Sequence, residues 1–284
     1  MELRDKIQNF YRTSNSVQKL IIINVIVFIV PFFFKTFTYL FALEKFNILS
    51  FFIIESDLTK LILKPWSVFT YGFIHLEDPE LFNSQNFYHL FKNMLILYYF
   101  GSLLQNLFGD KLVYSVFFNG IIFGGLLYVI SYNFFPVFIG IDSKMIGASS
   151  GVMAVLFYLT SYSPNMNIRL FIANIKLVYI AVFLLILDII QIPSGNSGGH
   201  IAHIGGAITG YCMLKYNYQG FDLFSFISFF KSKSKSKNNN INYNKIDQKR
   251  IDQILDKISE SGYDSLTKDE KNYLFKAGNK KDKN

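Results

Sequence analysis

The sequence predicts an all-α membrane protein, with helices that cross the bilayer six times and an interfacial external loop after the first. Its 284 residues are 51% hydrophobic and 18% aromatic, which is more apolar surface than one soluble core can bury. Apolar runs of helical length recur along the chain, and the charged residues collect between and after them. A helix needs about 20 apolar residues to cross the roughly 30 Å hydrocarbon layer, so these runs favour membrane spans.

The formal net charge is +8, and the excess of Lys and Arg lies in the tails. This distribution indicates orientation in the membrane and contact with anionic lipid rather than nucleic-acid binding. The single cysteine, Cys212, lies in an apolar stretch and is interpreted as a packing residue. Residues 1–19 are polar and mixed in charge, so no cleavable signal peptide is expected.

Six spans are expected, at residues 17–34, 89–108, 112–132, 149–161, 177–190 and 199–218. Four cations lie before or at the start of the first span, namely Arg4, Lys6, Arg12 and Lys19. By the positive-inside rule they place the N-terminus on the cytoplasmic side of the cell (inner) membrane. An even number of crossings returns the C-terminus to the same side. The aromatic external segment 36–80 is expected to lie in the interface, with its Trp and Tyr side chains at headgroup level.

The chain divides into four parts. Residues 1–16 form a cytoplasmic N-terminal segment, residues 17–218 the six-span domain, residues 219–245 a flexible basic linker, and residues 246–284 a small cytoplasmic helical hairpin. In the hairpin, Thr267-Lys-Asp-Glu270 has the spacing of a capping box that opens a helix. Docking of the hairpin to a partner or to the membrane surface is a hypothesis.

Span four is too short to cross the layer. Fifteen helical residues, 149–163, reach only about 22 Å at 1.5 Å per residue. Either residues 136–147 enter the protein as a re-entrant loop packed within the bundle, or the short helix is tilted. The first alternative places Ser149 below the outer surface, at a helix N-terminus whose free N–H groups favour an anion.

The start of span four also carries a second pattern. Gly147-x-Ser149-x-Gly151 matches the nucleophile elbow of soluble hydrolases, which requires a buried strand before the Ser and a helix after it. Residues 133–144, which precede it, are interrupted by Pro136, Gly140 and a charge, and another apolar run follows. The membrane interpretation is therefore preferred.

Polar residues recur in the opening turns of the even-numbered spans. Ser149 opens span four, His203 lies about one turn into span six, and His89 and Asn93 share one face at the start of span two. These three spans run in the same direction, so their first turns lie on one side of the membrane. Gly206-x-x-x-Gly210 after His203 is a small-residue face that allows two helices to approach closely. Membrane-embedded polar groups that converge in this way predict a functional site.

Together these motifs resemble the rhomboid family of intramembrane serine proteases. Those that carry the resemblance are Gly147-Ala-Ser-Ser-Gly-Val-Met153, Ala202-His-Ile-Gly-Gly206, His89-x-x-x-Asn93 and Trp66-x-x-Phe-Thr70, and it covers roughly residues 16–215. The resemblance implies that Ser149 is the nucleophile and His203 the general base, without an acidic third member. It assigns Asn93, His89, Gly147 and Ser150 to oxyanion or substrate binding. Transmembrane proteins are the implied substrates, and no metal or cofactor is implied.

Among the departures from the family pattern, two lie in the motif that carries Ser149. The residue after the nucleophile is usually Gly or Ala and here is Ser150, so either hydroxyl can be argued for. The residue four after the nucleophile is often Tyr and here is Met153, which fills space but cannot hydrogen-bond in the same way. These departures permit an alternative function, a catalytically inactive rhomboid-like protein that binds membrane proteins. A small-molecule transporter would show internal repeats or broken helices in both halves, which are not seen.

Other polar residues near the predicted site have structural explanations. His200 and His203 can ligate a metal, but no third ligand is apparent in the sequence. Asp188, near the outer end of span five, can complete a Ser, Asp, His order, although an Asp at a membrane boundary needs no catalytic explanation. His75 is interpreted as interfacial or structural. The Gly-rich stretch 191–199 is either a movable cap or an ordinary connecting loop.

Overall fold

The computed structural model describes residues 3–42, 47–76, 84–170 and 173–216, and some residues between 253 and 273. Residues up to 229 form one compact unit and residues 230–284 a second, and each unit is described by itself. The predicted linker, residues 219–245, lies outside the described residues.

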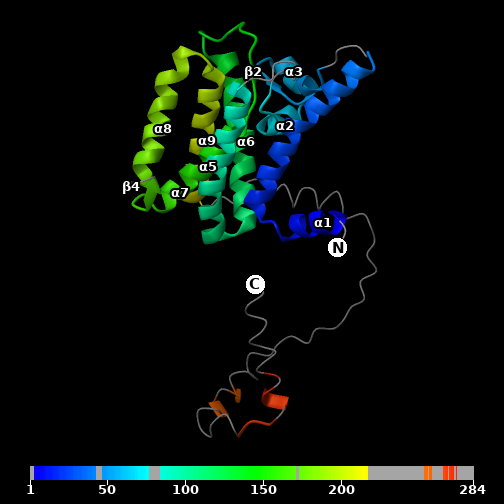
Figure 1. Ribbon diagram of the computed structural model, residues 1–284. Helices are drawn as coiled ribbons and strands as arrows, with labels where there is room; N and C mark the ends of the chain where they lie inside the picture. The colour runs from blue at the N-terminus through cyan, green and yellow to red at the C-terminus, as the bar shows by residue number, and fades with distance from the viewer. Residues whose placement is uncertain are drawn as a thin grey trace. The chain divides into compact units, whose positions relative to one another are not determined.

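The first unit is a helical bundle (Figure 1). Its α-helices are α1 (Leu3–Thr13), α2 (Ser16–Leu40), α3 (Leu58–Leu63), α4 (Ser67–Thr70), α5 (Ser84–Phe108), α6 (Asp110–Phe134), α7 (Ser149–Tyr162), α8 (Leu177–Gln191) and α9 (Ser197–Lys215). Single 3-10 turns cover Ile48–Phe51, Tyr71–Phe73 and Ile192–Ser194. The strands are β1 (Ile54–Glu55), β2 (Lys144–Met145), β3 (Asn167–Leu170) and β4 (Ala173–Lys176).

Helix α7 lies at the centre of the bundle. Nearly all of its residues from Ser150 to Thr160 are buried, as expected for a short helix that is apolar on every side. Helices α5, α7 and α9 run in one direction and α2, α6 and α8 in the other (Figure 1). The backbone N–H of Ser16, at the start of α2, donates to Asp110 at the start of α6 (3.0 Å), which joins two helix starts at the same end of the bundle.

Glycines bring α9 and α6 into backbone contact with α7. A methyl group at Gly206 would lie 2.0 Å from the Ser150 carbonyl oxygen, and one at Gly210 would lie 2.1 Å from the Ala154 carbonyl oxygen. Gly206 and Gly210 are four residues apart on α9, and the residues they face, Ser150 and Ala154, are four residues apart on α7. The two helices therefore pack in parallel. On α6, a methyl group at Gly120 would lie 2.4 Å from the Ala154 Cβ. Small residues therefore set the spacing of all three helices, as is typical where helices associate in membranes.

The external segment after α2 is folded and packed against the core. Strand β1 pairs antiparallel with β2, with Ile54 opposite Met145. Next to this pair the Ser56 hydroxyl donates to the Ile141 carbonyl (3.1 Å) and accepts from the Ser143 N–H (3.0 Å). The segment therefore holds the loop that leads into α7.

The loop before α7 enters the protein. Residues Met145, Gly147 and Ala148 are buried, whereas Gly140 to Asp142 are exposed. Only the end of this loop is therefore packed inside the bundle, and the choice between a re-entrant loop and a tilted helix stays a prediction. Helix α7 begins at Ser149, as expected.

Each of the six expected spans coincides with a helix, but the number of membrane crossings stays a prediction. Among the described residues, three helical stretches are long and apolar enough to cross a membrane: Ser16–Leu40, Asp110–Phe134 and Leu177–Ser194. Helix α7 is only 14 residues long, and α5 and α9 carry the polar and small residues of the candidate site. The chain is therefore a mostly helical membrane protein, as predicted.

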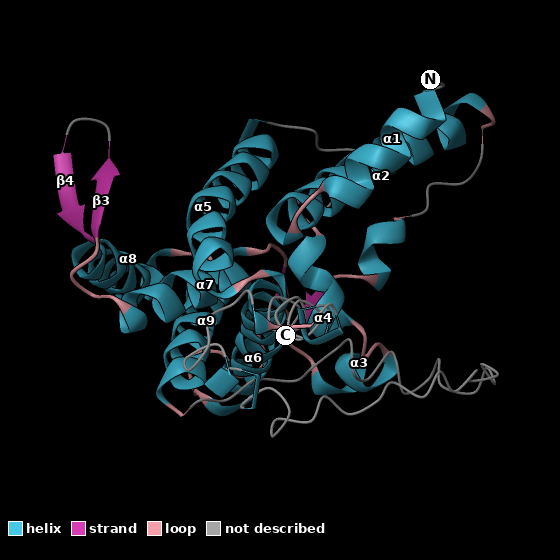
Figure 2. Cartoon of the chain, turned by 90° about the horizontal axis from the view of Figure 1, so that it is seen from below, coloured by secondary structure: helices cyan, strands magenta, loops and turns pink. Residues whose placement is uncertain are grey.

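Two local predictions are wrong. The sequence predicts Tyr side chains of the external segment at headgroup level, whereas Tyr71 is 1% exposed, because its hydroxyl finds polar partners inside the protein. No strand is predicted between spans four and five, yet β3 and β4 form an antiparallel hairpin, which projects from the helices near α8 (Figure 2).

In the second unit, the predicted capping box is present. The backbone N–H of Thr267 donates to the Glu270 carboxylate (2.8 Å), and the N–H of Glu270 donates to the Thr267 hydroxyl (3.3 Å). Glu270 also pairs with Lys257 (3.1 Å). Most other residues of the predicted hairpin, 246–284, lie outside the described residues.

We predict that Gly206→Ala destabilises the bundle by about 1–3 kcal/mol or more, because the added methyl overlaps the Ser150 carbonyl and forces α9 away from α7. Thermal unfolding in detergent micelles measures the effect. Ile208→Ala, at a position 54% exposed on the same helix, is the control. Equal unfolding temperatures for wild type and Gly206→Ala would contradict the packing.

We predict a pH-dependent contribution from Glu55. Burial raises the pKa of its carboxyl, but hydrogen bonds and charges from Lys60 and Lys64 outweigh burial and hold the pKa below 4.5. These pairs therefore stabilise the fold at neutral pH, and the stabilisation is lost as the pH falls through the lowered pKa. Glu55→Gln should unfold roughly 1–4 °C below wild type at pH 7. The difference should vanish in acid, and a difference that grows in acid would contradict this assignment.

Candidate active site

Ser149 is the first residue of α7. It is partly exposed, and within the described part of the chain its hydroxyl has no hydrogen-bond partner. The first turn of a helix presents unpaired backbone N–H groups and the positive end of the helix dipole. Ser149 therefore combines an unengaged hydroxyl with an environment that stabilises negative charge.

Ser150, the neighbouring hydroxyl, is fully engaged. Tyr71 donates its phenol proton to the Ile121 carbonyl (2.7 Å), and the hydroxyls of Tyr71 and Ser150 lie 2.9 Å apart. Because the phenol has one proton, the Ser150 hydroxyl must donate to the Tyr71 oxygen. Ser150 is 1% exposed and its side chain lies against Gly124 of α6. The sequence left either hydroxyl open as a nucleophile, and this geometry favours Ser149.

The turn before Ser149 requires glycine at position 147. Gly147 has φ +114°, a conformation that residues with a Cβ rarely adopt. A methyl group there would also lie 2.8 Å from the ring of His89 and 3.8 Å from the Ser149 Oγ. The His89 ring and the Ser149 hydroxyl therefore both lie beside Gly147, as their common assignment to one site requires.

The 71–75 segment holds this turn in place. The N–H of Gly147 donates to the Tyr71 carbonyl (3.0 Å), and the N–H of Ala148 donates to the His75 Nε2 (3.4 Å). His75 is 1% exposed, and its ring centroid lies 5.1 Å from that of His89. The structural interpretation of His75 therefore fits its contacts, although it is buried beside the site rather than in the interface.

Asn93 follows His89 by one turn of α5. Its Nδ2 donates to the His89 carbonyl (2.9 Å), and the residue is 5% exposed. One of its two amide protons is used in this bond, so the other can bind a developing oxyanion.

His203 is held by a carboxylate. Its Nδ1 lies 2.8 Å from the Asp188 Oδ1. Asp188 lies on α8 and is 7% exposed. If Nδ1 carries the proton, the other ring nitrogen, Nε2, is free to accept one.

His200 contacts the same carboxylate oxygen, with its Nδ1 2.8 Å from the Asp188 Oδ1. The sequence offered no third metal ligand beside the two histidines, whereas the structure supplies Asp188. The candidate ligand atoms of Asp188, His200 and His203 lie within 4.8 Å of one another. From the sequence, Asp188 is interpreted as a residue at a membrane boundary, with a Ser, Asp, His order as the alternative. Because α8 and α9 are separate in the chain, only their packing joins the three side chains.

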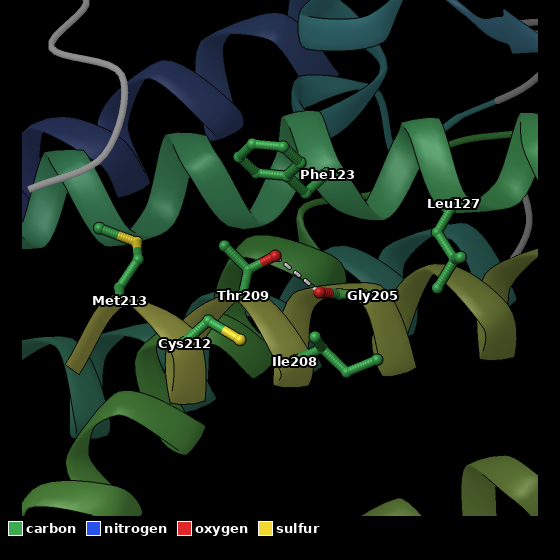
Figure 3. Close-up of a pocket in the computed structure, with 7 residues that line it drawn as sticks. All are labelled: Phe123, Leu127, Gly205, Ile208, Thr209, Cys212 and Met213. Atoms are coloured by element: carbon green, nitrogen blue, oxygen red, sulfur yellow. Dashed lines mark hydrogen bonds between the residues drawn. The ribbon is translucent and has the colours of Figure 1, made fainter. Parts of the chain in front are cut away.

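A separate pocket between α6 and α9 does not share this chemistry (Figure 3). Its lining consists of Phe123, Leu127, Gly205, Ile208, Thr209, Cys212 and Met213. The Thr209 hydroxyl donates back to the Gly205 carbonyl (2.7 Å), as Figure 3 shows. The pocket is therefore apolar, and Cys212 takes part in its lining, in agreement with a packing role.

We predict that Tyr71→Phe lowers the free energy of unfolding by about 1–3 kcal/mol, because the Ile121 carbonyl and the Ser150 hydroxyl both lose a buried partner. Chemical denaturation in mixed micelles measures the change. Tyr98→Phe removes a hydroxyl at a position that is 56% exposed and should leave stability unchanged. A Tyr71→Phe variant as stable as this control would refute the buried network.

Two sequence families match the chain. The Rhomboid domain matches residues 63–219, more than half of the chain, and a family of unknown function (DUF6576) matches residues 236–276. The chain is also similar to RHOMBOID-like protein 12, mitochondrial, of Arabidopsis thaliana, at 26% identity over 151 residues. That alignment covers 49% of this chain and 45% of the relative, so the chain spans less than half of the relative's length.

Proposed function

The chain belongs to the rhomboid family, and on this premise we propose that it is an intramembrane serine endopeptidase that cleaves transmembrane segments of other membrane proteins. The observation that carries the proposal is the contrast between two adjacent hydroxyls. Ser150 is buried and bonded to Tyr71, while the Ser149 hydroxyl is unengaged and lies, like the ring of His89, beside Gly147.

In the proposed reaction, the Ser149 Oγ attacks the carbonyl carbon of the scissile peptide bond. His203 accepts the hydroxyl proton on Nε2 and then donates it to the leaving amine. The backbone N–H of Ser149, the second amide proton of Asn93 and the ring of His89 stabilise the oxyanion. Water repeats the sequence and releases the new carboxyl end.

Asp188 extends this mechanism as a positioning residue. Its carboxylate accepts the Nδ1 proton of His203, which leaves Nε2 unprotonated for the nucleophile. The family resemblance alone implies a serine and histidine without an acid, so this role is supported by geometry that the motifs do not contain.

The proposed location is a cell (inner) membrane, with the N-terminus and C-terminus in the cytoplasm. The cations that precede α2 support this orientation by the positive-inside rule. Membrane-protein substrates and the lipid bilayer are the proposed partners.

The alternative is a catalytically inactive rhomboid-like protein that binds membrane proteins without cutting them. It is favoured by one observation: among the described residues, Ser149 and His203 share no hydrogen bond. Catalytic hydrogen bonds are often long without substrate, so the choice between the two functions requires a reactivity measurement.

We predict that a fluorophosphonate probe labels the purified protein at Ser149. Labelling and cleavage of a transmembrane substrate should be lost in Ser149→Ala, with kcat/KM at least roughly 10³-fold lower. Ser150→Ala is the matched control and should keep the labelling, because its hydroxyl is bonded to Tyr71. Absence of labelling in the folded wild-type protein would support the inactive alternative.

We predict that Asp188→Asn lowers kcat by roughly 10²–10⁴-fold with little change in KM. The Asn amide donates to Nδ1 of His203 and forces the ring proton onto Nε2, so the base is blocked. Steady-state kinetics in micelles separate kcat from KM, and Asp188→Glu should recover part of the rate. A loss confined to KM would exclude the positioning role.

A further inference from the structure

We propose that Asp188, His200 and His203 form a binding site for a divalent transition metal, with Zn²⁺ as the probe, and that metal binding there reversibly inhibits the enzyme. The inhibition rests on the proposed function, whereas the metal site itself does not.

The donor set fits Zn²⁺. Two imidazole nitrogens and one carboxylate oxygen, with an open fourth position for water, form a common zinc ligand set in proteins. In this protein the two Nδ1 atoms each lie 2.8 Å from the same Asp188 oxygen, and all three donor atoms lie within 4.8 Å of one another. Tetrahedral ligands at the usual zinc distances are separated by about 3.3 Å. The two nitrogen–oxygen pairs already lie near this separation, and the remaining pair of ligand atoms, at most 4.8 Å apart, must close by at most about 1.5 Å to admit the ion.

Burial and charge also favour the site. The side chains of Asp188, His200 and His203 are only 10%, 13% and 20% exposed. The carboxylate supplies one negative charge to a dication in a poorly hydrated place, where such an attraction is strong. The two histidines stand three residues apart on α9, so the helix presents both rings to α8.

Metal binding blocks the base through the tautomer of His203. A metal on Nδ1 displaces the ring proton that Asp188 accepts, and in the neutral ring this proton moves to Nε2. General-base catalysis requires Nε2 to be unprotonated when Ser149 attacks. The metal-bound protein therefore cannot take the Ser149 proton, and removal of the metal restores the active tautomer.

The experiment uses the full-length protein in detergent, stripped of metal with a chelator. Zn²⁺ should inhibit cleavage of a transmembrane substrate, and excess chelator should restore it. His200→Ala should retain cleavage, because His203 keeps its bond to Asp188, but should need at least tenfold more Zn²⁺ for half inhibition. Cys212→Ser removes the one thiol in the chain and should respond to Zn²⁺ as wild type does. Equal inhibition of wild type and His200→Ala would overturn the proposal.

Direct binding separates this inference from the proposed function. Competition with a chromophoric zinc chelator should show one Zn²⁺ bound by Ser149→Ala and a much weaker site in the double variant Ser149→Ala/His200→Ala. This result would hold even if the protein cut no substrate. Equal Zn²⁺ binding by the two variants, or none in Ser149→Ala, would refute the metal site and leave the protease proposal untouched.

Discussion

The close approach of α7 to α6 and α9 is the constraint on which the rest of the structure depends. Where these helices meet, glycines replace side chains, and Gly206 packs so closely on the Ser150 carbonyl that a Cβ would lie 2.0 Å from it. In a membrane, helix association cannot rely on the exclusion of water, so backbone contact through small residues supplies the packing. The start of α7 is thereby placed between α5 and α9.

The loop that leads into α7 is the second requirement. Helix α7 has 14 residues, and the loop that precedes it carries polar backbone groups into the protein. Such a loop is tolerated only if its groups are satisfied, and here Tyr71 and His75 accept the N–H groups of Gly147 and Ala148. The segment at residues 71–75 thus fixes the conformation of the turn that carries Ser149.

The candidate site divides its polar groups between packing and chemistry. Ser150 and Tyr71 complete a buried hydrogen-bond network, which leaves one hydroxyl, Ser149, unengaged. One oxygen of Asp188 contacts two imidazoles, which links His203, the proposed general base, to His200. In the metal-free protein the Asp188 carboxylate orients the ring of His203. In the proposed metal-bound state the same carboxylate binds the cation.

The helical membrane class and the positions of the six helices α2 and α5 to α9 could be predicted from the sequence alone, and so could four candidate site residues, His89, Asn93, Ser149 and His203. Hydrophobic runs and small-residue spacing are local properties of the chain. They therefore predict that Ser149 begins α7 and that His89 and Asn93 share one face of α5. The bond between Tyr71 and Ser150, and the contact of Asp188 with both His200 and His203, became visible only in the folded protein. These contacts join segments distant in the chain, and the packing of α8 on α9 and of residue 71 on α6 has no signature in local periodicity.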